Sequence, residues 1–542
     1  MKSFRFLLIG LALTVVVLGA WGLDLFTGLE LSSLNLRFEN RGPRAVQAPV
    51  VLVAIDDESL NGWIDSKGHE LFMPERWTWP RTVYARLVDN LKAAGAKVIG
   101  FDLEFSESSQ REPSQDLAFA AACKRAGNVV LGVRFTQIEG AYAQGRHLET
   151  LIPPLATAAV DTGLVNLDAD PDNFRRRVAL VDPESQIPNL DLAILRQYLW
   201  GKPEKLVLDE TAGTLTFGSR VAHAFRGVLL PANYVGGPGT FPTYSFHQVF
   251  DKSMDMSVFK DKMVLVGSTS PILHDNFFTP FSGHRESMPG VEIHANVIDT
   301  LYSGQYLSQL SNRWEALLIL GLGLLTCLAT FKIGSWQGTV VVAAELGLYV
   351  WLCFAAFSHA RIILPVAAPV ASIFVSFAGL AAYRGIVEER RARDVRNQFS
   401  RYVSKSIVDE IMKDPTKISL GGQTKEVTIL FSDVRDFTPL SEKLQPDELV
   451  AMLNEYLTAM VDVVMENGGT LDKYVGDAIM AVWGSPLPDP QHRQKAVTTA
   501  VKMLERLQVL RQKLAAEGKP LIDIGIGLNS GKVVAGNMGH LH

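Results

Sequence analysis

The chain has few cysteines and no excess of basic charge. Its 542 residues include only three cysteines, and two of them, Cys327 and Cys353, lie in apolar stretches. Cys123 is therefore the single cysteine of the large polar segment, which excludes an internal disulfide there and with it a disulfide-stapled secreted scaffold. The formal net charge is −5, so the composition gives no indication of nucleic-acid binding.

Apolar residues are abundant, and they are concentrated in a few runs. The mean hydropathy is +0.13, and the runs cover residues 6–23, 314–331, 339–357 and 362–383. Each is close to the ~20 residues that a helix needs to cross ~30 Å of hydrocarbon. A cleaved signal peptide is the alternative for the first run, but no small-x-small cleavage site follows it cleanly. We therefore expect an N-terminal anchor within residues 1–24 and three transmembrane helices within residues 313–383.

Basic residues flank the first and last apolar runs. Lys2 and Arg5 precede the first run, and the last is followed by Arg384, Arg390, Arg391, Arg393 and Arg396. Positive charge is enriched on the cytoplasmic side of membrane proteins, so both ends of the membrane region are expected in the cytoplasm. Four spans satisfy both orientations. The sequence therefore predicts a multi-pass protein of the cell (inner) membrane, with residues 25–312 and 358–361 outside and residues 333–337 in the cytoplasm.

The apolar runs contain little that would form a transport pathway. Glu345 is the one acid in the middle of a span, and an intramembrane acid is a candidate functional residue. We expect it to hydrogen-bond to a neighbouring helix, because a transporter or channel needs polar residues along several helices. Pro365 and Pro369 are expected to kink the fourth span near its outer end.

The predicted outside segment, residues 25–312, alternates strand and helix patterns. Apolar runs predict buried strands at 50–56, 96–105, 128–135 and 263–269, and residues 81–95 predict an amphipathic helix closed by Gly95. This alternation is typical of an α/β layer fold with a largely parallel central sheet.

Three groups of segments in this region carry a family resemblance. They read AIDDESL, then WPRTVYARLVDNLKAAGAKVIGFDLEF, then VLVGST, HDNFFTP and MPGVEIHANVIDTLYSGQYL. In this order they resemble the second class of CHASE extracellular sensor domains over most of residues 30–310. The resemblance implies a module that senses a ligand whose identity is unknown.

Several polar residues of this domain could line a site. Asp56, Asp57, Asp102 and Glu104 follow predicted strands, and the carboxyl ends of parallel strands line the ligand crevice of open α/β sheets. The alternative is that these acids are solvated or cap helices. A second group, which consists of His274, Asp275, His284 and His294, matches no metal-binding spacing, so structural roles are expected for it.

A charged segment at 384–421 follows the last apolar run. It has a partly regular apolar stripe, and no Pro or Gly follows Gly385 until Pro415. We expect a helix that transmits a signal from the membrane, and the alternative is an inert spacer.

Two acidic residues in the last part of the chain suit metal-ion chemistry. Asp433 lies in FSDVRDFT at 431–438, and Asp477 lies in KYVGDAIMAVWG at 473–484, each at the end of an apolar strand-like run. Two carboxylates held by buried strands suit a pair of Mg²⁺ ions, which need hard oxygen ligands and leave positions open for phosphate. Two-metal sites stabilise both oxygens of a phosphoryl displacement. Ordinary surface aspartates are the alternative from spacing alone.

The wider sequence over residues 399–539 resembles the class III nucleotide cyclases. The resemblance rests on the two motifs above together with FSRYVSKSIVDEIMKDP, LGGQTKEVTILFSDVRDFT and IGIGLNSGKVVAGNMG. It implies an α+β (ferredoxin-like) catalytic domain at 422–542 that makes a cyclic nucleotide at a homodimer or heterodimer interface.

The same resemblance assigns roles to individual residues. It implies that Asp433, Asp477 and the backbone carbonyl of Val434 hold two Mg²⁺ ions per site, with Mn²⁺ as an alternative, and that Phe437 and Thr438 meet the triphosphate. Lys473 takes the position of the purine-contacting residue, where lysine suits adenine N1, so ATP is the expected substrate. Lys473 is expected to serve the site opposite to the one built by the aspartates of its own chain.

The family normally continues beyond the GNMG motif with a second purine selector, an asparagine and an arginine. Here GNMG is followed by His540, Leu541 and His542. The expected function is a membrane-bound receptor-type adenylate cyclase. The alternative is a catalytically dead or heterodimer-dependent signalling protein, because that Asn and Arg segment does not occur within the 542 residues.

Overall fold

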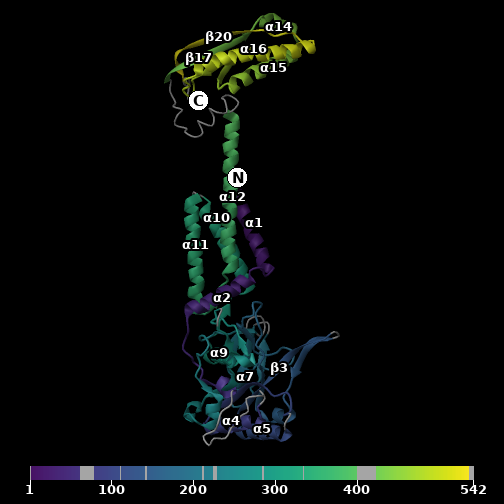
Figure 1. Ribbon diagram of the computed structural model, residues 1–542, viewed down its shortest axis with the longest axis vertical. Coiled ribbons are helices and arrows are strands. Elements are labelled where there is room, and N and C mark those ends of the chain that lie inside the picture. Colours follow the sequence, from purple (N-terminus) through teal and green to yellow (C-terminus); the bar gives the residue numbers. More distant parts are fainter. Residues whose placement is uncertain are drawn as a thin grey trace. The chain divides into compact units, whose positions relative to one another are not determined.

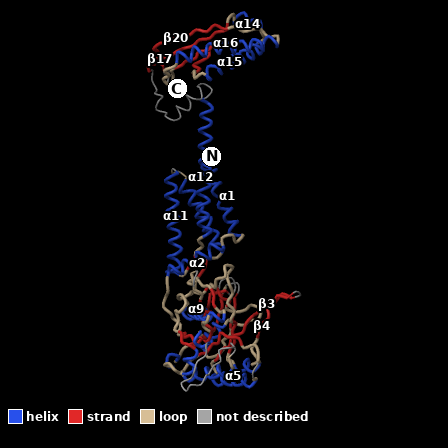
Figure 2. Tube along the Cα trace, viewed as in Figure 1, coloured by secondary structure: helices blue, strands red, loops and turns tan. Residues whose placement is uncertain are grey.

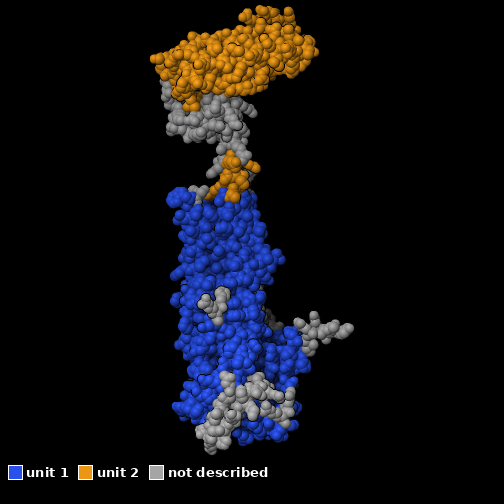
Figure 3. Space-filling model, in the orientation of Figure 1, with its two compact units in different colours: residues 1–381 blue, residues 382–542 orange. Residues whose placement is uncertain are grey.

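The computed structural model describes residues 2–60, 79–109, 112–140, 143–209, 213–223, 229–283, 286–331, 333, 335–399 and 423–535. The chain divides into two compact units, Met1–Ala381 and Ala382–His542 (Figure 3). His284, the GNMG motif and residues 400–421 of the predicted linker helix lie outside the described residues. The two units are treated separately below.

The first unit contains a mixed sheet that is parallel at its centre. Its strand order is β11-β1-β12-β2-β3-β4, and β5 also pairs with β3. All neighbours are parallel except β4, which returns antiparallel to β3. The strands are β1 (Val50–Ile55), β2 (Val98–Glu104), β3 (Val129–Gly140), β4 (Ala143–Glu149), β5 (Asp161–Leu164), β11 (Thr243–Ser245) and β12 (Met263–Ser268). The four predicted strands and the largely parallel sheet are confirmed.

Helices cover both faces of this sheet, which explains why its strands read as continuous apolar runs. Alternate residues of β1 enter opposite cores: Val51 and Val53 face α4 (Arg81–Ala93), α5 (Pro113–Ala126) and α8 (Phe246–Asp251), whereas Leu52 faces α7 (Leu190–Trp200) and α9 (Gly290–Ser303). The predicted helix at 81–95 is α4, and Gly95 follows it with a φ of +84°.

Smaller elements complete the domain. They are α3 (Asp57–Leu60), α6 (Pro153–Ala158), β6 (Arg177–Ala179), β7 (Leu206–Asp209), β8 (Thr214–Phe217), β9 (Arg220–His223), β10 (Leu229–Pro231), β13 (Asn276–Phe277) and β14 (Met288–Pro289). The sheet and its helices form one end of this unit, and long apolar helices form the other (Figure 1, Figure 2).

Three helices of the described chain are long and apolar enough to cross a membrane. They are α10 (Asn312–Thr330), α11 (Ser335–Ala355) with its extension to Ala360, and the first part of α12 (Ala367–Phe399). The first predicted run forms α1 (Lys2–Gly22), which is followed by α2 (Thr27–Arg41) at a bend of 82°, and the bent pair would make a fourth span if it crosses as one. Glu345 Oε2 accepts a hydrogen bond from Thr326 Oγ1 on α10 (3.0 Å), as expected.

The prediction that Pro365 and Pro369 kink the fourth span is wrong. The helix begins only at Ala367, so Pro365 precedes it and Pro369 lies in its first turn, where backbone N–H groups have no intrahelical acceptor to lose. Ile362–Ile363, expected inside the span, instead form β16, which pairs in parallel with β15 (Ser308–Gln309) of the α/β domain.

Helix α2 attaches the α/β domain to the start of α12. The fully buried Arg37 pairs with Glu30 (Nη2 to Oε1, 2.7 Å) and donates from Nη1 to the carbonyl oxygen of Leu364 (2.8 Å). The second oxygen of Glu30 accepts from the N–H groups of Val366 and Ala367 (2.7 and 2.9 Å). This cluster of bonds ties α2 to the segment that leads into α12.

The second unit is an antiparallel sheet with its long helices on one face. The strand order is β18-β19-β17-β20, and Trp483, Leu430 and Tyr456 belong to the core between sheet and helices. The other face exposes Phe431. The elements are β17 (Gln423–Val434), α14 (Phe437–Lys443), α15 (Pro446–Glu466), β18 (Thr470–Val475), β19 (Ala478–Trp483), α16 (His492–Ala516) and β20 (Ile524–Ala535).

Candidate functional site

The two predicted metal-binding aspartates lie at the same end of the second unit's sheet. Asp433 is the penultimate residue of the central strand β17. Asp477 belongs to the two-residue turn Gly476–Asp477 between β18 and β19, whose register pairs Val475 with Ala478. Gly476 has a φ of +66°, the left-handed conformation that tight hairpin turns require and that glycine adopts without strain.

The two carboxylates interact with one another. The N–H of Val434 donates to Asp477 Oδ2 (3.1 Å), which ties the turn to the end of β17. Partial desolvation and the neighbouring Asp477 carboxyl raise the pKa of Asp433. Like charges this close disfavour each other's ionised form, and a bound cation would relieve that repulsion. The donor set of this chain therefore fits a hard divalent ion.

In the part of the chain that the structure describes, no third acidic, histidine or cysteine side chain joins them. Within the described residues, no group of three or more His, Cys, Asp or Glu side chains is arranged to hold a metal. Ions at this site would take their remaining ligands from backbone oxygens, water and substrate, which is how Mg²⁺ is usually bound beside phosphates.

The remaining predicted residues share this region of the unit. Phe437 and Thr438 open α14, directly after Asp436, which has a φ of +54°. Lys473 lies on β18 beside a register shift after Leu471. Its side chain is 61% exposed, and its Nζ lies 3.3 Å from Asp472 Oδ2.

Strand register places Lys473 and Asp433 on one face of the sheet. Lys473 pairs with Met480, and Met480 pairs with Phe431 on β17. Directly opposed residues share a face, and so do residues two apart on one strand, so Asp433 also lies on this open face. Lys473 lies on β18, two strands away from β17. Because neighbouring strands are about 4.8 Å apart, this places it about 10 Å from β17.

The first unit contains a polar cavity of about 490 Å³ at the carboxyl ends of β2, β5 and β12. Asp102 and Glu104 line it, together with His274 and Asp275. The strand-end acids were expected either to line a ligand crevice or to be solvated or cap helices. Asp102 and Glu104 line a crevice. Other polar lining residues, which the sequence patterns did not indicate, are Arg81, Arg134, Asn166, Arg175 and Ser268.

The other two strand-end acids have the alternative role. Asp56 accepts hydrogen bonds from the N–H and Oγ of Ser59 (2.9 and 2.6 Å) at the start of α3. Asp57 accepts from the hydroxyl of Ser270. Neither lines the cavity at the ends of β2, β5 and β12.

His294 lies fully buried behind that cavity. Its Nδ1 is 2.8 Å from Asp191 Oδ1, and its Nε2 is 3.7 Å from Asp102 Oδ1. Burial alone would lower the pKa of His294, but the carboxylates of Asp191 and Asp102 outweigh it and raise the pKa to about 9. Burial raises the pKa of Asp102 to about 7, against the opposing effect of His294. The histidine thus has the structural role expected for it.

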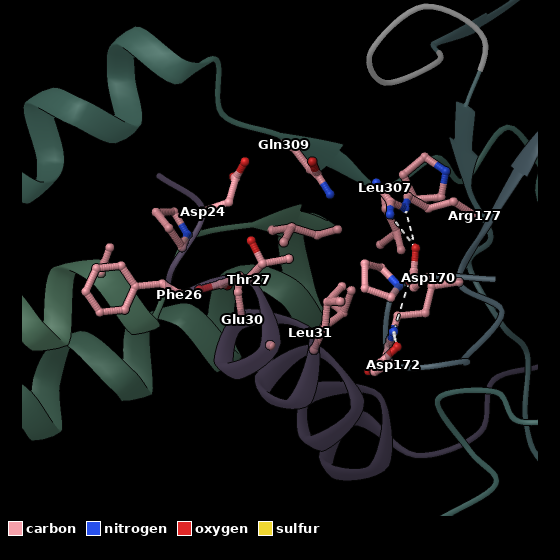
Figure 4. A pocket seen from close by; sticks show the side chains of 18 of the residues that line it. Asp24, Phe26, Thr27, Glu30, Leu31, Asp170, Asp172, Arg177, Leu307 and Gln309 are labelled. Carbon is pink, nitrogen blue, oxygen red and sulfur yellow. Dashed lines mark hydrogen bonds and ion pairs between the residues drawn. The ribbon is translucent and has the colours of Figure 1, made fainter. Parts of the chain in front are cut away.

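A second cavity, of about 620 Å³, lies where α2 meets the α/β domain and the start of α12 (Figure 4). Its charged residues are largely paired with each other. Arg176 pairs with Asp170 and Asp172 (2.9 and 2.7 Å), and Arg177 Nε donates to Asp170 (2.8 Å). Leu31 and Leu307 are among its apolar lining residues.

Comparisons with known proteins identify both units. The CHASE2 domain family matches residues 10–328, more than half of the chain, and the adenylate and guanylate cyclase catalytic domain matches residues 421–542. Adenylate cyclase 1 of Rhizobium meliloti (strain 1021) is 34% identical over 149 residues, which cover 28% of this chain and 22% of that protein. Adenylate cyclase of Anabaena cylindrica is 34% identical over 149 residues, which cover 26% of this chain and 29% of that protein.

Solved cyclase structures also match the second unit. The crystal structure of the adenylyl cyclase CyaB from P. aeruginosa is 39% identical, covers 22% of this chain and 63% of that chain, and has a TM-score of 0.22. The chain spans less than a third of the length of the two curated cyclases that it matches. It belongs to the CHASE2 domain family and joins its CHASE2 domain to a class III adenylate and guanylate cyclase catalytic domain.

Proposed function

We propose that this protein is a membrane-bound, receptor-type adenylate cyclase that converts ATP to cyclic AMP and pyrophosphate at a dimer interface. The CHASE2 domain lies outside the cell membrane and senses a ligand, and the cyclase domain lies in the cytoplasm. The observation that carries the proposal is the approach of Asp433 and Asp477, which the hydrogen bond from Val434 N–H holds at one end of an open sheet face.

Two kinds of comparison support the choice of reaction. The second unit matches the adenylate and guanylate cyclase catalytic domain, and relatives at 34% identity are named adenylate cyclases. Class III cyclase domains in general use divalent metal ions, and the two interacting carboxylates suit Mg²⁺, with Mn²⁺ as an alternative.

Different residues of this chain would bind the metal ions and the triphosphate. Asp433, Asp477 and the backbone oxygen of Val434 would hold the ions, which supply charge neutralisation at the 3′-hydroxyl and the departing pyrophosphate. Phe437 and Thr438 position the triphosphate at the start of α14. Because the attack is intramolecular, correct positioning and electrostatic stabilisation account for most of the rate.

Lys473 determines the choice of base in this proposal. Its exposed ammonium group donates hydrogen bonds and has no acceptor function, so it complements the acceptor N1 of adenine. It serves the site whose metal-binding aspartates come from a second copy of the chain, so the enzyme is active as a dimer.

The receptor role draws on the attachment of α2 to α12. Glu30 and Arg37 bond to the backbone at Leu364, Val366 and Ala367. Helix α12 then continues without interruption to Phe399. A displacement of the CHASE2 domain would therefore move the start of the helix that precedes the cyclase domain in the sequence.

The test is a cyclic AMP assay on membranes that contain the protein expressed from its complete reading frame. Asp433→Ala should reduce the Mg²⁺-dependent rate to below about one tenth, because the ions lose a protein carboxylate. Asp462→Ala, which changes an exposed acid of α15 in the same domain, is the matched control and should keep the parental rate. Equal rates for both variants would show that Asp433 holds no essential ion.

A further inference from the structure

The polar cavity of the CHASE2 domain, at the ends of β2, β5 and β12, has the position and size of a ligand site. Its volume of about 490 Å³ falls within the range of roughly 300–1,000 Å³ that small-molecule sites occupy. Its charged lining consists of three arginines and three acids: Arg81, Arg134, Arg175, Asp102, Glu104 and Asp275. The formal charges balance, so a ligand with a large net charge would leave charge uncompensated.

Two buried polar atoms of the lining have no hydrogen-bond partner among the described residues. One is the acceptor Asp102 Oδ2, on a side chain that is only 8% exposed. The other is the donor Nε of Arg175. A buried polar atom without a partner costs about 1–3 kcal/mol, so native proteins pair such atoms with protein, water or ligand. The cavity thus contains one unpaired acceptor and one unpaired donor.

Three of the other charged groups are engaged. Arg134 pairs with Glu104 (2.6 Å), and Arg81 lies 3.5 Å from Asp116. Behind the cavity, His294 approaches Asp102 through Oδ1 (3.7 Å), which leaves Oδ2 for another donor. The unpaired acceptor and donor are therefore two groups with which a ligand can form new bonds.

We propose that this cavity binds a small zwitterion of the α-amino acid class, whose ammonium group donates to Asp102 and whose carboxylate accepts from Arg175. Such a ligand satisfies both unpaired atoms and adds no net charge to a balanced cavity. The lining supplies a carboxylate for a cation and a guanidinium for a carboxylate, which is a strong charge-assisted pairing.

The larger cavity beside α2 does not share these features. None of the polar side-chain atoms that line it, within the described residues, is both buried and unpaired. Its arginines Arg176 and Arg177 already pair with Asp170. The unpaired atoms therefore favour the cavity at the carboxyl ends of the strands as the ligand site.

The test is thermal unfolding of the full chain in detergent, followed by intrinsic fluorescence with each of the standard L-α-amino acids. At least one should raise the unfolding temperature in a saturable way, because a ligand that binds only the folded state stabilises it. The amine and the carboxylic acid that share its side chain, and its N-trimethylated form, should not. Stabilisation by none of the amino acids, or equally by the singly charged or trimethylated analogues, would overturn the proposal.

Variants locate the site. Asp102→Asn and Arg175→Gln should each weaken binding of the active amino acid about tenfold or more, because each removes a charge-assisted hydrogen bond. Glu184→Gln changes an exposed acid that pairs with Arg146 outside this cavity and should bind as the parent does. If Asp102→Asn does not fold, the affinity of Arg175→Gln and the comparison of the amino acid with its analogues test the proposal instead. Unchanged affinity in folded variants would refute the site. No cyclase assay is involved, so a negative result leaves the proposed function standing.

Discussion

Both units bring two acidic side chains close together, but in opposite environments. In the CHASE2 domain, Asp102 and Asp191 are buried around His294. In the cyclase domain, Asp433 and Asp477 lie at the open end of the sheet and interact with each other and with the Val434 N–H. The first cluster contains its own cation, His294, whereas no ion pair joins Asp433 or Asp477 to a basic side chain among the described residues.

This difference separates a buried ion pair that stabilises the fold, Asp191 with His294, from a pair of carboxylates that can bind a cation. Buried carboxylates must be paired, because an isolated buried charge is very costly. Two carboxylates that repel each other at a surface lower the stability of the fold slightly. A bound cation removes this repulsion, so such a pair is suited to bind one. The same change, from carboxylate to amide, should therefore have opposite consequences in the two units.

The largest effect is expected in the cyclase domain. Asp477→Asn should abolish nearly all cyclic AMP formation, because the amide cannot replace a negatively charged ligand of a hard cation. Its unfolding temperature should stay the same or rise slightly, since the repulsion with Asp433 is removed. Parallel activity and unfolding measurements check this. A large loss of stability would place Asp477 among the structural charges instead.

The second prediction is the converse, in the CHASE2 domain. Asp191→Asn should destabilise the first unit by about 3–5 kcal/mol, because it leaves the His294 cation buried beside a weaker partner. Chemical denaturation followed by tryptophan fluorescence measures the change, with the exposed Glu184→Gln as the control that should stay close to the parent. A shift equal to that of the control would mean that His294 is neutral in the folded state.

The third prediction concerns pH and the same histidine. The pKa of His294 is about 9 in the folded state, above its ordinary 6.5. Its stabilising contribution is therefore complete below about pH 6.5 and is lost as pH rises through about 9, by up to about 3 kcal/mol. His294→Gln should flatten this decline in unfolding free energy. An unchanged decline would assign it to other groups.

The sequence was sufficient for the parts of the fold that depend on local patterns. Four strands, the helix ending before Gly95 and three apolar helices follow from hydrophobic periodicity and length. The error at Ile362–Ile363 has a clear cause. In the sequence, two apolar residues beside an apolar helix cannot be distinguished from part of that helix. Ile362–Ile363 form a strand because they pair with β15, which is distant in the chain.

The candidate sites show the same division. Asp433 and Asp477 could be found because their motifs are local. Arg175 and Asp191 could not, because each acts with a residue far away in the chain: Arg175 with the Asp102 cavity, and Asp191 with His294. A single sequence carries no signal for such pairs, and they appear only when the sheet brings the segments together.

The fourth prediction sharpens the role of the open face. Lys473→Glu should weaken ATP use about tenfold or more, because two acceptors would then face each other at adenine N1, at a cost of roughly 1–3 kcal/mol. Because Lys473 is exposed, stability should change little. Steady-state kinetics with ATP and GTP measure the effect. Unchanged ATP kinetics would show that Lys473 does not contact the base.

A mixing experiment extends this prediction to the dimer. If Lys473 serves a site whose aspartates come from the second copy, co-expressed Asp433→Ala and Lys473→Glu chains should form one site with both residues intact. The mixture should then regain part of the activity that each variant lacks alone. No recovery in verified mixed dimers would place Lys473 and Asp433 of one chain in the same site.

The smallest effect is expected for the strand-end acid that only caps a helix. Asp56 accepts hydrogen bonds from Ser59 N–H and Oγ at the start of α3, and removal of such a cap typically costs about 1 kcal/mol. Asp56→Ala should therefore lower the unfolding free energy of the first unit by about that amount, well below the effect of Asp191→Asn. Amino-acid binding in the Asp102 cavity should be unaffected, because Asp56 does not line it. Denaturation and ligand titration of the same preparation check both points. A loss of binding as large as that of Asp102→Asn would mean that the capping turn shapes the cavity, and the division between capping and ligand-facing acids would fail.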